Sequence, residues 1–341
     1  MKPTIKTQTK KKENLKIPKI YRRNSCHTIS FQVVDISTSL CYYLYLLKHQ
    51  QAQTVKKQGE NSMTTRIIVD STADLVPEIK KRVHTVPLTL HFGNEEYIDG
   101  VTIDHKEFYE KLIESDVLPT TSQATPDAFI KEFEKTKENG EAAVVITLSS
   151  KFSGTFQSAT IAASEYENIY VVDSASAAMG SGILVELAFR LLDEGKSAQE
   201  IAQIIEEEKK KIIVVALVDT LEYLKKGGRI SKTVAFAGGV LNIKPVLSVI
   251  DGEINMLGKA RGSKMGNNLL VEEINKAGGI DFTKPVLLGY SGISNALLLK
   301  YIDDSKHIWE GNIKEVRYTT LGSVIGTHAG PGAVVVAFYK K

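Results

Sequence analysis

The residues with the clearest potential for chemistry are hydroxyl side chains crowded into one turn. Ser149, Ser150, Ser153 and Thr155 lie close together, and Gly154 keeps the turn open. Residues 143–148, which precede them, form an apolar run that is typical of a buried segment, and residues 156–163, which follow, are compatible with a helix. Hydroxyls and backbone N–H groups that meet at a helix N-terminus attract anions. This turn is therefore a candidate site for an anionic group.

The elements that would position this turn follow from its flanks. Residues 143–148 are continuously apolar and β-branched, which is typical of a strand covered on both faces of a parallel sheet. Strands at 66–70 and 169–173 also end in small polar residues that precede a helical stretch. These residues are Asp70, Ser71, Thr72, Asp173 and Ser174. Three such units predict a parallel sheet with a polar carboxyl edge, where ligands of open α/β sheets bind.

Ordinary helix capping is the alternative explanation for these polar turns, because Ser, Thr and Asp commonly start helices. A further hydroxyl cluster at Thr120, Thr121 and Ser122, in a predicted loop at 119–125, favours a binding site over three unrelated caps.

The rest of the chain predicts two α/β domains. We expect a parallel-sheet α/β domain at 63–175 and an α+β domain at 176–341. Helices are expected from about 75 and at 104–114, 127–137, 156–163, 180–192, 197–211 and 220–224. Further strands are expected at 83–90, 92–98, 212–218, 246–250, 254–257, 286–290, 313–318 and 333–339.

The charge is unevenly distributed. Residues 1–62 carry 12 Lys and Arg against 3 Asp and Glu, whereas residues 63–341 carry 31 against 37. The overall net charge of +3 therefore conceals a mildly acidic main part. This balance argues against nucleic acid as a partner.

Residues 1–62 differ in character from the rest. Their apolar piece at 38–47 is too short and interrupted to span a bilayer, so we expect no stable membrane insertion, and it is a poor signal peptide. Because Met63 begins a self-sufficient strand-first pattern, we interpret 1–62 as an extraneous or disordered tail, translated from a start that is too early. We expect its removal to leave folding and ligand binding intact.

Both cysteines, Cys26 and Cys41, lie in this tail. The remainder can form neither a disulfide nor a thiolate site, which fits a cytoplasmic protein. The sequence predicts no metal and no cofactor.

Familiar catalytic and nucleotide motifs do not fit. The glycines near 180 and 258 lack dinucleotide and phosphate-loop spacing, and Ser153 is not in a G-x-S-x-G turn. His328 lies in GTHAGPG at 326–332, where we expect a tight loop that keeps the imidazole accessible. Arg229, beyond a predicted glycine cap, and Arg261 are candidates to face an anionic group. Solvated surface charges remain the alternative for both.

Several motifs then combine in a specific order. They are DST at 70–72, TSQ at 121–123, SGT at 153–155, DS at 173–174, LEYLKKGGRI at 221–230, NIKPVL at 242–247 and HAGPGA at 328–333. Together they resemble the successive motifs of the DegV family of bacterial fatty-acid-binding proteins, over residues 63–341. Ala124 departs from the Pro that is common in the family after T-S-Q.

The resemblance implies two α/β domains with a long-chain fatty acid buried between them. Its carboxylate would be held by hydroxyls at the positions of Thr121 and Ser153, with Ser122 and Gly154 beside them. Hydroxyls without a nearby lysine suit a singly charged carboxylate better than a phosphate.

The resemblance also implies a partner, an ATP-dependent kinase that converts the bound acid to an acyl phosphate. The chain would then be a carrier without catalytic activity of its own. We expect His328, Arg229 and Arg261 near the headgroup or facing the kinase, and the turns at Asp70 and Asp173 in support. A serine hydrolase or acyl transferase that uses Ser153 and His328 is the alternative.

Overall fold

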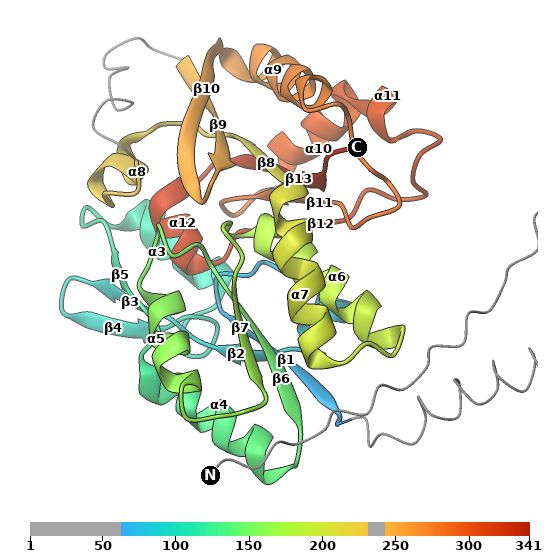
Figure 1. Ribbon diagram of the computed structural model, residues 1–341. Coiled ribbons are helices and arrows are strands. Elements are labelled where there is room, and N and C mark those ends of the chain that lie inside the picture. The colour runs from blue at the N-terminus through green and yellow to red at the C-terminus, as the bar shows by residue number, and fades with distance from the viewer. Residues whose placement is uncertain (1–62, 231–242) are drawn as a thin grey trace, which may run out of the picture. The chain divides into compact units, whose positions relative to one another are not determined.

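The computed structural model describes residues 63–230 and 243–341 (Figure 1). The expectations for residues 1–62, including both cysteines, lie outside the described residues. The described part of the chain contains no helix that is long and apolar enough to cross a membrane.

A parallel sheet forms the centre of the N-terminal part. It contains β1 (Thr65–Asp70), β2 (His84–Val86), β6 (Ala142–Thr147) and β7 (Ile169–Asp173), in the order β2-β1-β6-β7. All neighbouring strands in it run parallel. Every residue of β1 and β6 is buried, as expected for central strands of a parallel sheet, and those of β1 include the polar Thr65, Arg66 and Asp70.

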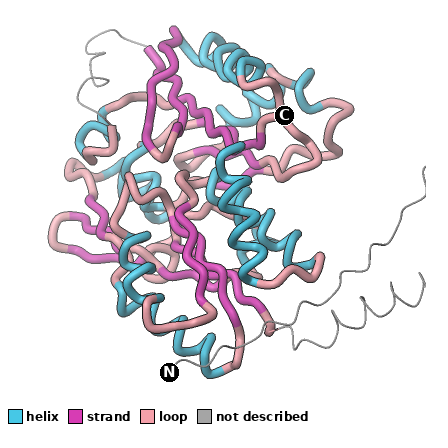
Figure 2. The backbone as a smooth tube through the Cα atoms, viewed as in Figure 1, coloured by secondary structure: helices cyan, strands magenta, loops and turns pink. Residues whose placement is uncertain are grey.

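Helices cover both faces of this sheet (Figure 1, Figure 2). On one face lie α4 (Pro126–Glu138) and α5 (Thr155–Ala163), which share a core with Ile68. On the other lie α6 (Met179–Asp193) and α7 (Ala198–Glu208), which share a core with Ile67. The alternation of β1 side chains between two cores follows from the two-residue period of a strand.

A small antiparallel sheet stands beside the parallel one. It contains β3 (Thr89–Phe92), β4 (Glu95–Ile98) and β5 (Thr120–Ser122), in the order β4-β3-β5. The predicted hairpin is confirmed, with Gly93 at a φ of 59° in its turn. The predicted strand at 83–90 is two strands, and the predicted loop at 119–125 contains β5, which pairs with β3.

The shorter helices of this part follow their local signals. The helix α2 (Pro77–Lys80) begins at a proline, later than expected. The helix α3 (His105–Glu114) begins at a capping box in which the Asp104 side chain accepts from the Glu107 N–H and the Glu107 side chain accepts from the Asp104 N–H. Thr125 caps α4.

A larger mixed sheet forms the C-terminal part. Its strands are β8 (Ile212–Leu217), β9 (Ile243–Ile250), β10 (Glu253–Arg261), β11 (Leu287–Tyr290), β12 (Tyr318–Thr320) and β13 (Val334–Tyr339). Their order is β10-β9-β8-β13-β11-β12, and only β11 and β12 pair in parallel. The strand predicted at 313–318 is wrong, because Ile313 and Val316 pack into the core from an irregular segment.

The two sheets and their helices confirm the expected α/β fold with a second mixed-sheet domain. The helix α6 contacts β1 and β6 on one side and β8, β11 and β13 on the other. The far face of the larger sheet is covered by α9 (Gly262–Lys276), α10 (Ala296–Asp304) and α11 (Lys306–Trp309). A domain boundary near residue 176 stays a prediction.

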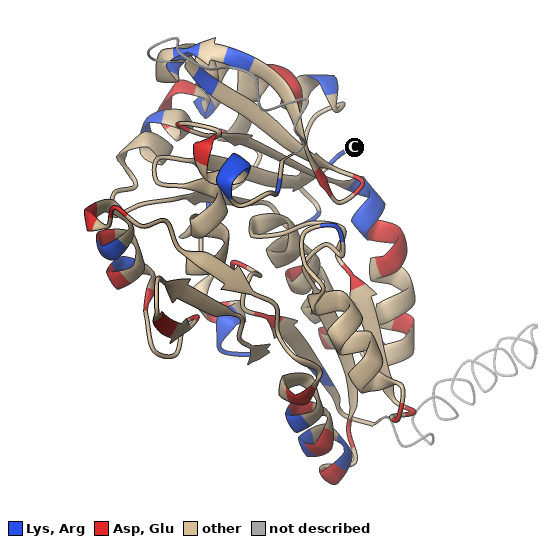
Figure 3. Cartoon of the chain, turned by 90° about the vertical axis from the view of Figure 1, so that its left-hand side faces the viewer, with Lys and Arg blue, Asp and Glu red and all other residues tan. Residues whose placement is uncertain are grey.

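Charged residues of both signs are interspersed along the helices (Figure 3). The end of α7 is an example, where Lys209, Lys210 and Lys211 each pair with a glutamate three residues earlier. Such pairs balance the charge locally and contribute little to stability individually.

Candidate functional site

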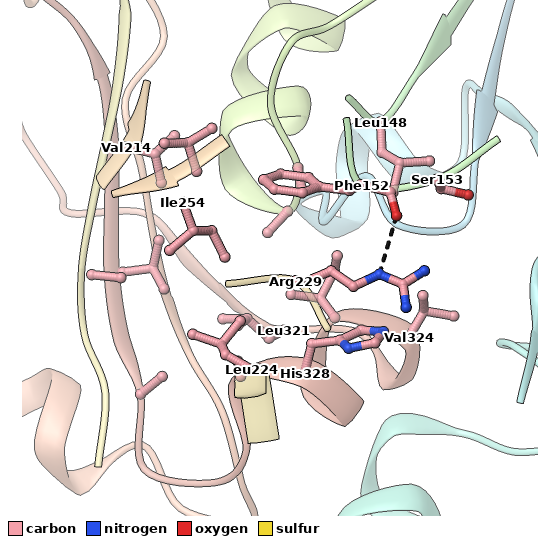
Figure 4. A pocket seen from close by; sticks show the side chains of 18 of the residues that line it. Leu148, Phe152, Ser153, Val214, Leu224, Arg229, Ile254, Leu321, Val324 and His328 are labelled. Atoms are coloured by element: carbon pink, nitrogen blue, oxygen red, sulfur yellow. Dashed lines mark hydrogen bonds between the residues drawn. The ribbon is translucent and has the colours of Figure 1, made fainter. Parts of the chain in front are cut away.

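A cavity of about 130 Å³ is bordered on one side by strands β8, β9 and β13 of the larger sheet. Residues of β5 and of the turn that follows β6 also border it. Aliphatic side chains from β8, β9, β13 and α12 (Ser323–Ala329) form most of its wall, together with Ala177 and Ala178 just before α6. Its polar lining residues are Thr121, Ser122, Gln123, Ser153, Ser248, Arg229 and His328. In Figure 4 the side chains of Ser153, Arg229 and His328 lie on one side of the pocket, and Val214 and Ile254 lie on the other.

The apolar wall follows directly from strand geometry. Val214 and Ala216 of β8 and Val218 just beyond it border the cavity, whereas Val215 between them packs into the opposite core. Alternate residues of a strand face one side of its sheet, so one strand supplies three successive apolar surfaces. A wall of this kind excludes water and suits a hydrocarbon chain.

Thr121 lies at the polar end of the cavity. The pairing of β5 with β3 fixes its backbone, since Thr121 lies opposite Leu90. Its Oγ1 is 3.1 Å from Nε2 of His328. The neighbouring Ser122 also borders the cavity, but its hydroxyl hydrogen-bonds Nε2 of His91 at 3.0 Å.

His328 is not in the expected tight loop. It lies in the last turn of α12, and the glycine turn follows it. The imidazole is half-buried, and its Nδ1 has no hydrogen-bond partner among the described residues. Gly227 packs against that nitrogen so closely that an added Cβ would lie 2.2 Å from it. The expected loop is therefore wrong, whereas the half-buried imidazole still lines the cavity.

The protonation of His328 follows from these surroundings. Burial, assisted by the nearby positive charge of Arg229, lowers its pKa to about 4. The ring is neutral near pH 7, so one ring nitrogen carries a proton and the other accepts. We assign the proton to Nε2, because a buried N–H without a partner is rarer than an unpaired acceptor. Nε2–H then donates to Thr121.

Arg229 connects two loops at the polar end. Gly228 ends α8 (Glu222–Lys226) with a φ of 68°, as the sequence predicts for a glycine cap. Arg229 Nε donates to the Phe152 carbonyl at 3.1 Å (Figure 4). Its Nη1 donates to the Gly227 carbonyl at 2.8 Å. The side chain is half-buried and lines the cavity, which brings a cation to the hydroxyls.

The hydroxyl-rich turn is held at the start of α5. Ser153 Oγ lies 2.9 Å from Thr155 Oγ1 and accepts from the Thr155 N–H at 3.2 Å. Gly154 is the N-cap position, and the Gln123 side chain lies where its Cβ would be. Gln123 Nε2 in turn donates to Ser158 of α5 at 2.9 Å. Gln123 thereby ties the strand that carries Thr121 to the helix beside Ser153.

The other predicted turns lie behind the cavity. The buried Asp70 carboxylate accepts from the Leu148 N–H at 2.7 Å and from the Thr72 N–H at 2.9 Å. Burial raises the pKa of Asp70. Ser71 Oγ accepts from the Leu88 N–H at 3.1 Å.

The turn after β7 is bonded in the same internal way. The Asp173 carboxylate accepts from the Ser150 and Ala175 N–H groups, and Ser174 Oγ donates to the Ser176 carbonyl at 3.1 Å. These groups bond the backbone and do not line the cavity.

Arg261 is not brought to the site. It ends β10 on the exposed surface and is not a lining residue of the cavity. Sequence reasoning missed Gln123 and Phe152, which do line it. The position of Gln123 within the TSQ motif was the available signal for that residue. Within residues 63–230 and 243–341, no group of three or more His, Cys, Asp or Glu could hold a metal ion.

The fold and the site together define a class, an α/β protein that encloses an apolar cavity with hydroxyls at one end. The family model described as "Uncharacterised protein, DegV family" matches residues 64–341. The chain belongs to the DegV family. A DegV domain-containing protein of Caldanaerobacter subterraneus subsp. tengcongensis is 36% identical over 281 residues, which cover 81% of this chain and 98% of the relative.

Solved structures give the same result. A fatty-acid-binding DegV family protein of Thermus thermophilus is 31% identical, covering 82% of this chain and 100% of its own, with a TM-score of 0.73. DegV of Bacillus subtilis, described as a fatty acid binding protein, is 31% identical with the same coverages and a TM-score of 0.68. A Thermotoga maritima protein described as having a fatty acid binding function is 26% identical, again with these coverages, with a TM-score of 0.70.

Proposed function

We propose that this protein binds a long-chain fatty acid in its apolar cavity. The carboxylate lies on the hydroxyls of Thr121 and Ser153, and the acyl chain lies against the apolar wall. The observation that carries the proposal is the gathering of hydroxyl and cationic donors at one end of an otherwise aliphatic cavity. Three similar solved structures described as fatty acid binding, two of them of DegV proteins, support it.

The polar end suits a single negative charge. Thr121 and Ser153 each offer a hydroxyl, and hydrogen bonds to a charged acceptor are stronger than those between neutral groups. Arg229 supplies the one cation that lines the cavity among the described residues, and neutral His328 adds no second charge. One guanidinium and two hydroxyls match a carboxylate better than a doubly charged phosphate.

The hydrolase alternative fits this geometry poorly. A serine nucleophile needs a base within hydrogen-bond reach. His328 Nε2 is engaged with Thr121, whereas the hydroxyl of Ser153 bonds Thr155. A pKa of about 4 would also make His328 a weak base at neutral pH. These contacts favour a carrier over a catalyst.

The proposal extends to a partner kinase that phosphorylates the bound acid with ATP. A phosphoryl group would bring further negative charge to the polar end of the cavity, where Arg229 can offset it and neutral His328 can keep Thr121 oriented. Arg261 remains a candidate for contact with the kinase on the exposed surface. This part of the proposal rests on the resemblance to the DegV family.

Mass spectrometry of lipid extracted from the purified protein tests the binding function. We expect a long-chain fatty acid in near-stoichiometric amount, and lipid-free protein that takes up no added fatty acid would contradict the proposal. For the kinase step, we expect Arg261→Ala to retain fatty-acid binding and to lower acyl-phosphate formation with a reconstituted kinase. We expect His328→Ala to lower acyl-phosphate formation by more than its loss of fatty-acid binding explains, because it also releases Thr121. Wild-type turnover in both variants would contradict their proposed part in that step.

A further inference from the structure

Thr155 is buried directly behind the hydroxyl of Ser153. It is the first residue of α5, its exposed fraction is 0%, and it does not line the cavity. Its Oγ1 accepts from the Ala124 N–H at 3.3 Å and lies 2.9 Å from Ser153 Oγ. Ser153 itself is half-buried and borders the cavity. Thr155 can therefore influence a ligand only through Ser153.

The proton of Thr155 has one destination among the described residues. A buried hydroxyl proton without an acceptor costs free energy, so it points to an acceptor where one is in reach. Ser153 Oγ is the acceptor that the described part of the chain offers to this hydroxyl. Thr155 therefore donates to Ser153, and not the reverse.

This donation fixes the direction of the Ser153 hydroxyl. A serine oxygen has two lone pairs and one proton. One lone pair accepts from the Thr155 N–H at 3.2 Å, and the other accepts from the Thr155 hydroxyl. Both acceptor positions are then occupied, so the group retains only its proton for a ligand in the cavity.

The hydroxyl of Thr121 is also oriented as a donor toward the cavity. His328 Nε2–H donates to Thr121 Oγ1 at 3.1 Å, so the Thr121 proton is directed elsewhere, toward the cavity that the residue lines. The hydroxyls of Thr121 and Ser153 lie on separate elements, and each directs its proton into the cavity. His328 positions the first hydroxyl and Thr155 positions the second.

We infer that Thr155 is a positioning residue that makes Ser153 a hydrogen-bond donor, so that the site selects lipids whose headgroup only accepts hydrogen bonds. The inference rests on the proposed function and deepens it. A carboxylate satisfies both donors. A fatty alcohol can accept from them, but its own proton then finds no acceptor on Ser153. The expected consequence is discrimination between an acid and an alcohol of equal chain length.

The test is Thr155→Val, measured with palmitic acid and hexadecanol in parallel titrations. Valine keeps the branched shape and removes the hydroxyl that donates to Ser153. Ser153 then regains a free lone pair and can accept the alcohol proton. We expect the ratio of acid to alcohol affinity to fall about tenfold, which corresponds to one charged hydrogen bond losing its fixed direction.

Two controls separate orientation from packing. Thr155→Ser keeps the donating hydroxyl and should retain the wild-type ratio. Thr160→Val removes a hydroxyl from the exposed side of the same helix, where it donates to the Phe156 carbonyl at 2.9 Å. It should leave the ratio unchanged. A purely structural role for Thr155 would lower both affinities together and leave their ratio intact.

An unchanged ratio in Thr155→Val, with wild-type protein that binds the acid, overturns the inference and leaves the proposed function standing. Wild-type protein that binds neither lipid overturns both. If Thr155→Val does not fold, Thr155→Cys answers the same question, because a thiol is a weak donor of similar size.

Discussion

Two turns of this protein look alike in sequence and differ in what their polar groups face. Each follows a buried parallel strand, one at Asp70–Thr72 after β1 and one at Ser149–Thr155 after β6. In the first, the carboxylate of Asp70 is saturated by the backbone of Leu148 and by Thr72. In the second, the hydroxyl of Ser153 remains at the cavity.

The difference shows that a polar turn at a sheet edge can offer hydrogen-bond donors to a ligand only when some of its polar side chains are not already bonded to the backbone. We call the turn at Asp70–Thr72 the closed turn and the turn at Ser149–Thr155 the open turn. The closed turn supports the open one, because the Asp70 carboxylate accepts from the Leu148 N–H and Leu148 lines the cavity. A change in the closed turn should therefore reduce stability, whereas a change in the open turn should reduce binding.

The largest effect is expected from Asp70→Asn in the closed turn. An amide cannot accept all the hydrogen bonds of the carboxylate, so buried N–H donors lose a partner. We expect the free energy of unfolding to fall by about 3 kcal/mol in a denaturant titration. The exposed Asp116→Asn is the matched control and should change it by less than about 0.5 kcal/mol. Equal stability of the two variants would remove the distinction between the turns.

In the open turn, Ser153→Ala should weaken fatty-acid binding by about 1.5 to 3 kcal/mol, because it removes one hydrogen bond to a charged acceptor. Thr121→Val should act similarly, and the two losses should be non-additive if one carboxylate joins both hydroxyls. Titration with a fluorescent fatty acid measures the affinities, and thermal melts should remain close to wild type. Unchanged affinity in both variants would place the headgroup elsewhere.

A smaller effect is expected on the pH dependence of stability, through the protonation of His328. The pKa of His328 is about 4 in the folded chain and about 6.5 when unfolded. The unfolded chain binds the proton more readily, so stability is present above pH 6.5 and is lost as the pH falls toward 4. His328→Gln should flatten this part of the curve, measured by denaturant titrations at several pH values. A slope equal to that of wild type would show that His328 is not buried in its neutral form.

The smallest effect is expected on the pKa of His328. Burial is the main cause of the low value, and the charge of Arg229 is the second. Arg229→Met removes the charge and keeps much of the side-chain volume, so the pKa of His328 should rise modestly. An NMR titration of the imidazole measures it. Lys225→Met, a nearby exposed cation on α8, is the control and should leave the pKa close to wild type.

Most of the fold was predictable because its elements carry their own signals. The apolar run of β6, the capping box before α3 and Pro126 at the start of α4 each specify an element locally. The hydroxyl candidates were also visible, Ser153 in a turn after a predicted strand and Thr121 in a hydroxyl cluster of a predicted loop.

What could not be predicted depends on contacts between distant residues. The helix α12 contains Gly326 and Thr327, which are weak helix formers. It is anchored instead by its surroundings, since the Gly322 N–H donates to Asp74 at 2.8 Å and Gly326 packs against Tyr109. The pairing of Thr121 with His328 joins residues 207 positions apart. Local patterns contain no signal for such approaches.

The place of β13 has a consequence for how the protein is made. This strand is inserted between β8 and β11 in the middle of the larger sheet, and α12, which carries His328, immediately precedes it. Both elements emerge from the ribosome after almost every other part of the cavity. The parallel sheet can form while synthesis continues, because domains fold as units in the order of their translation. A nascent chain that already displays Thr121 and Ser153 must therefore wait for residues 323–339 before the cavity can close.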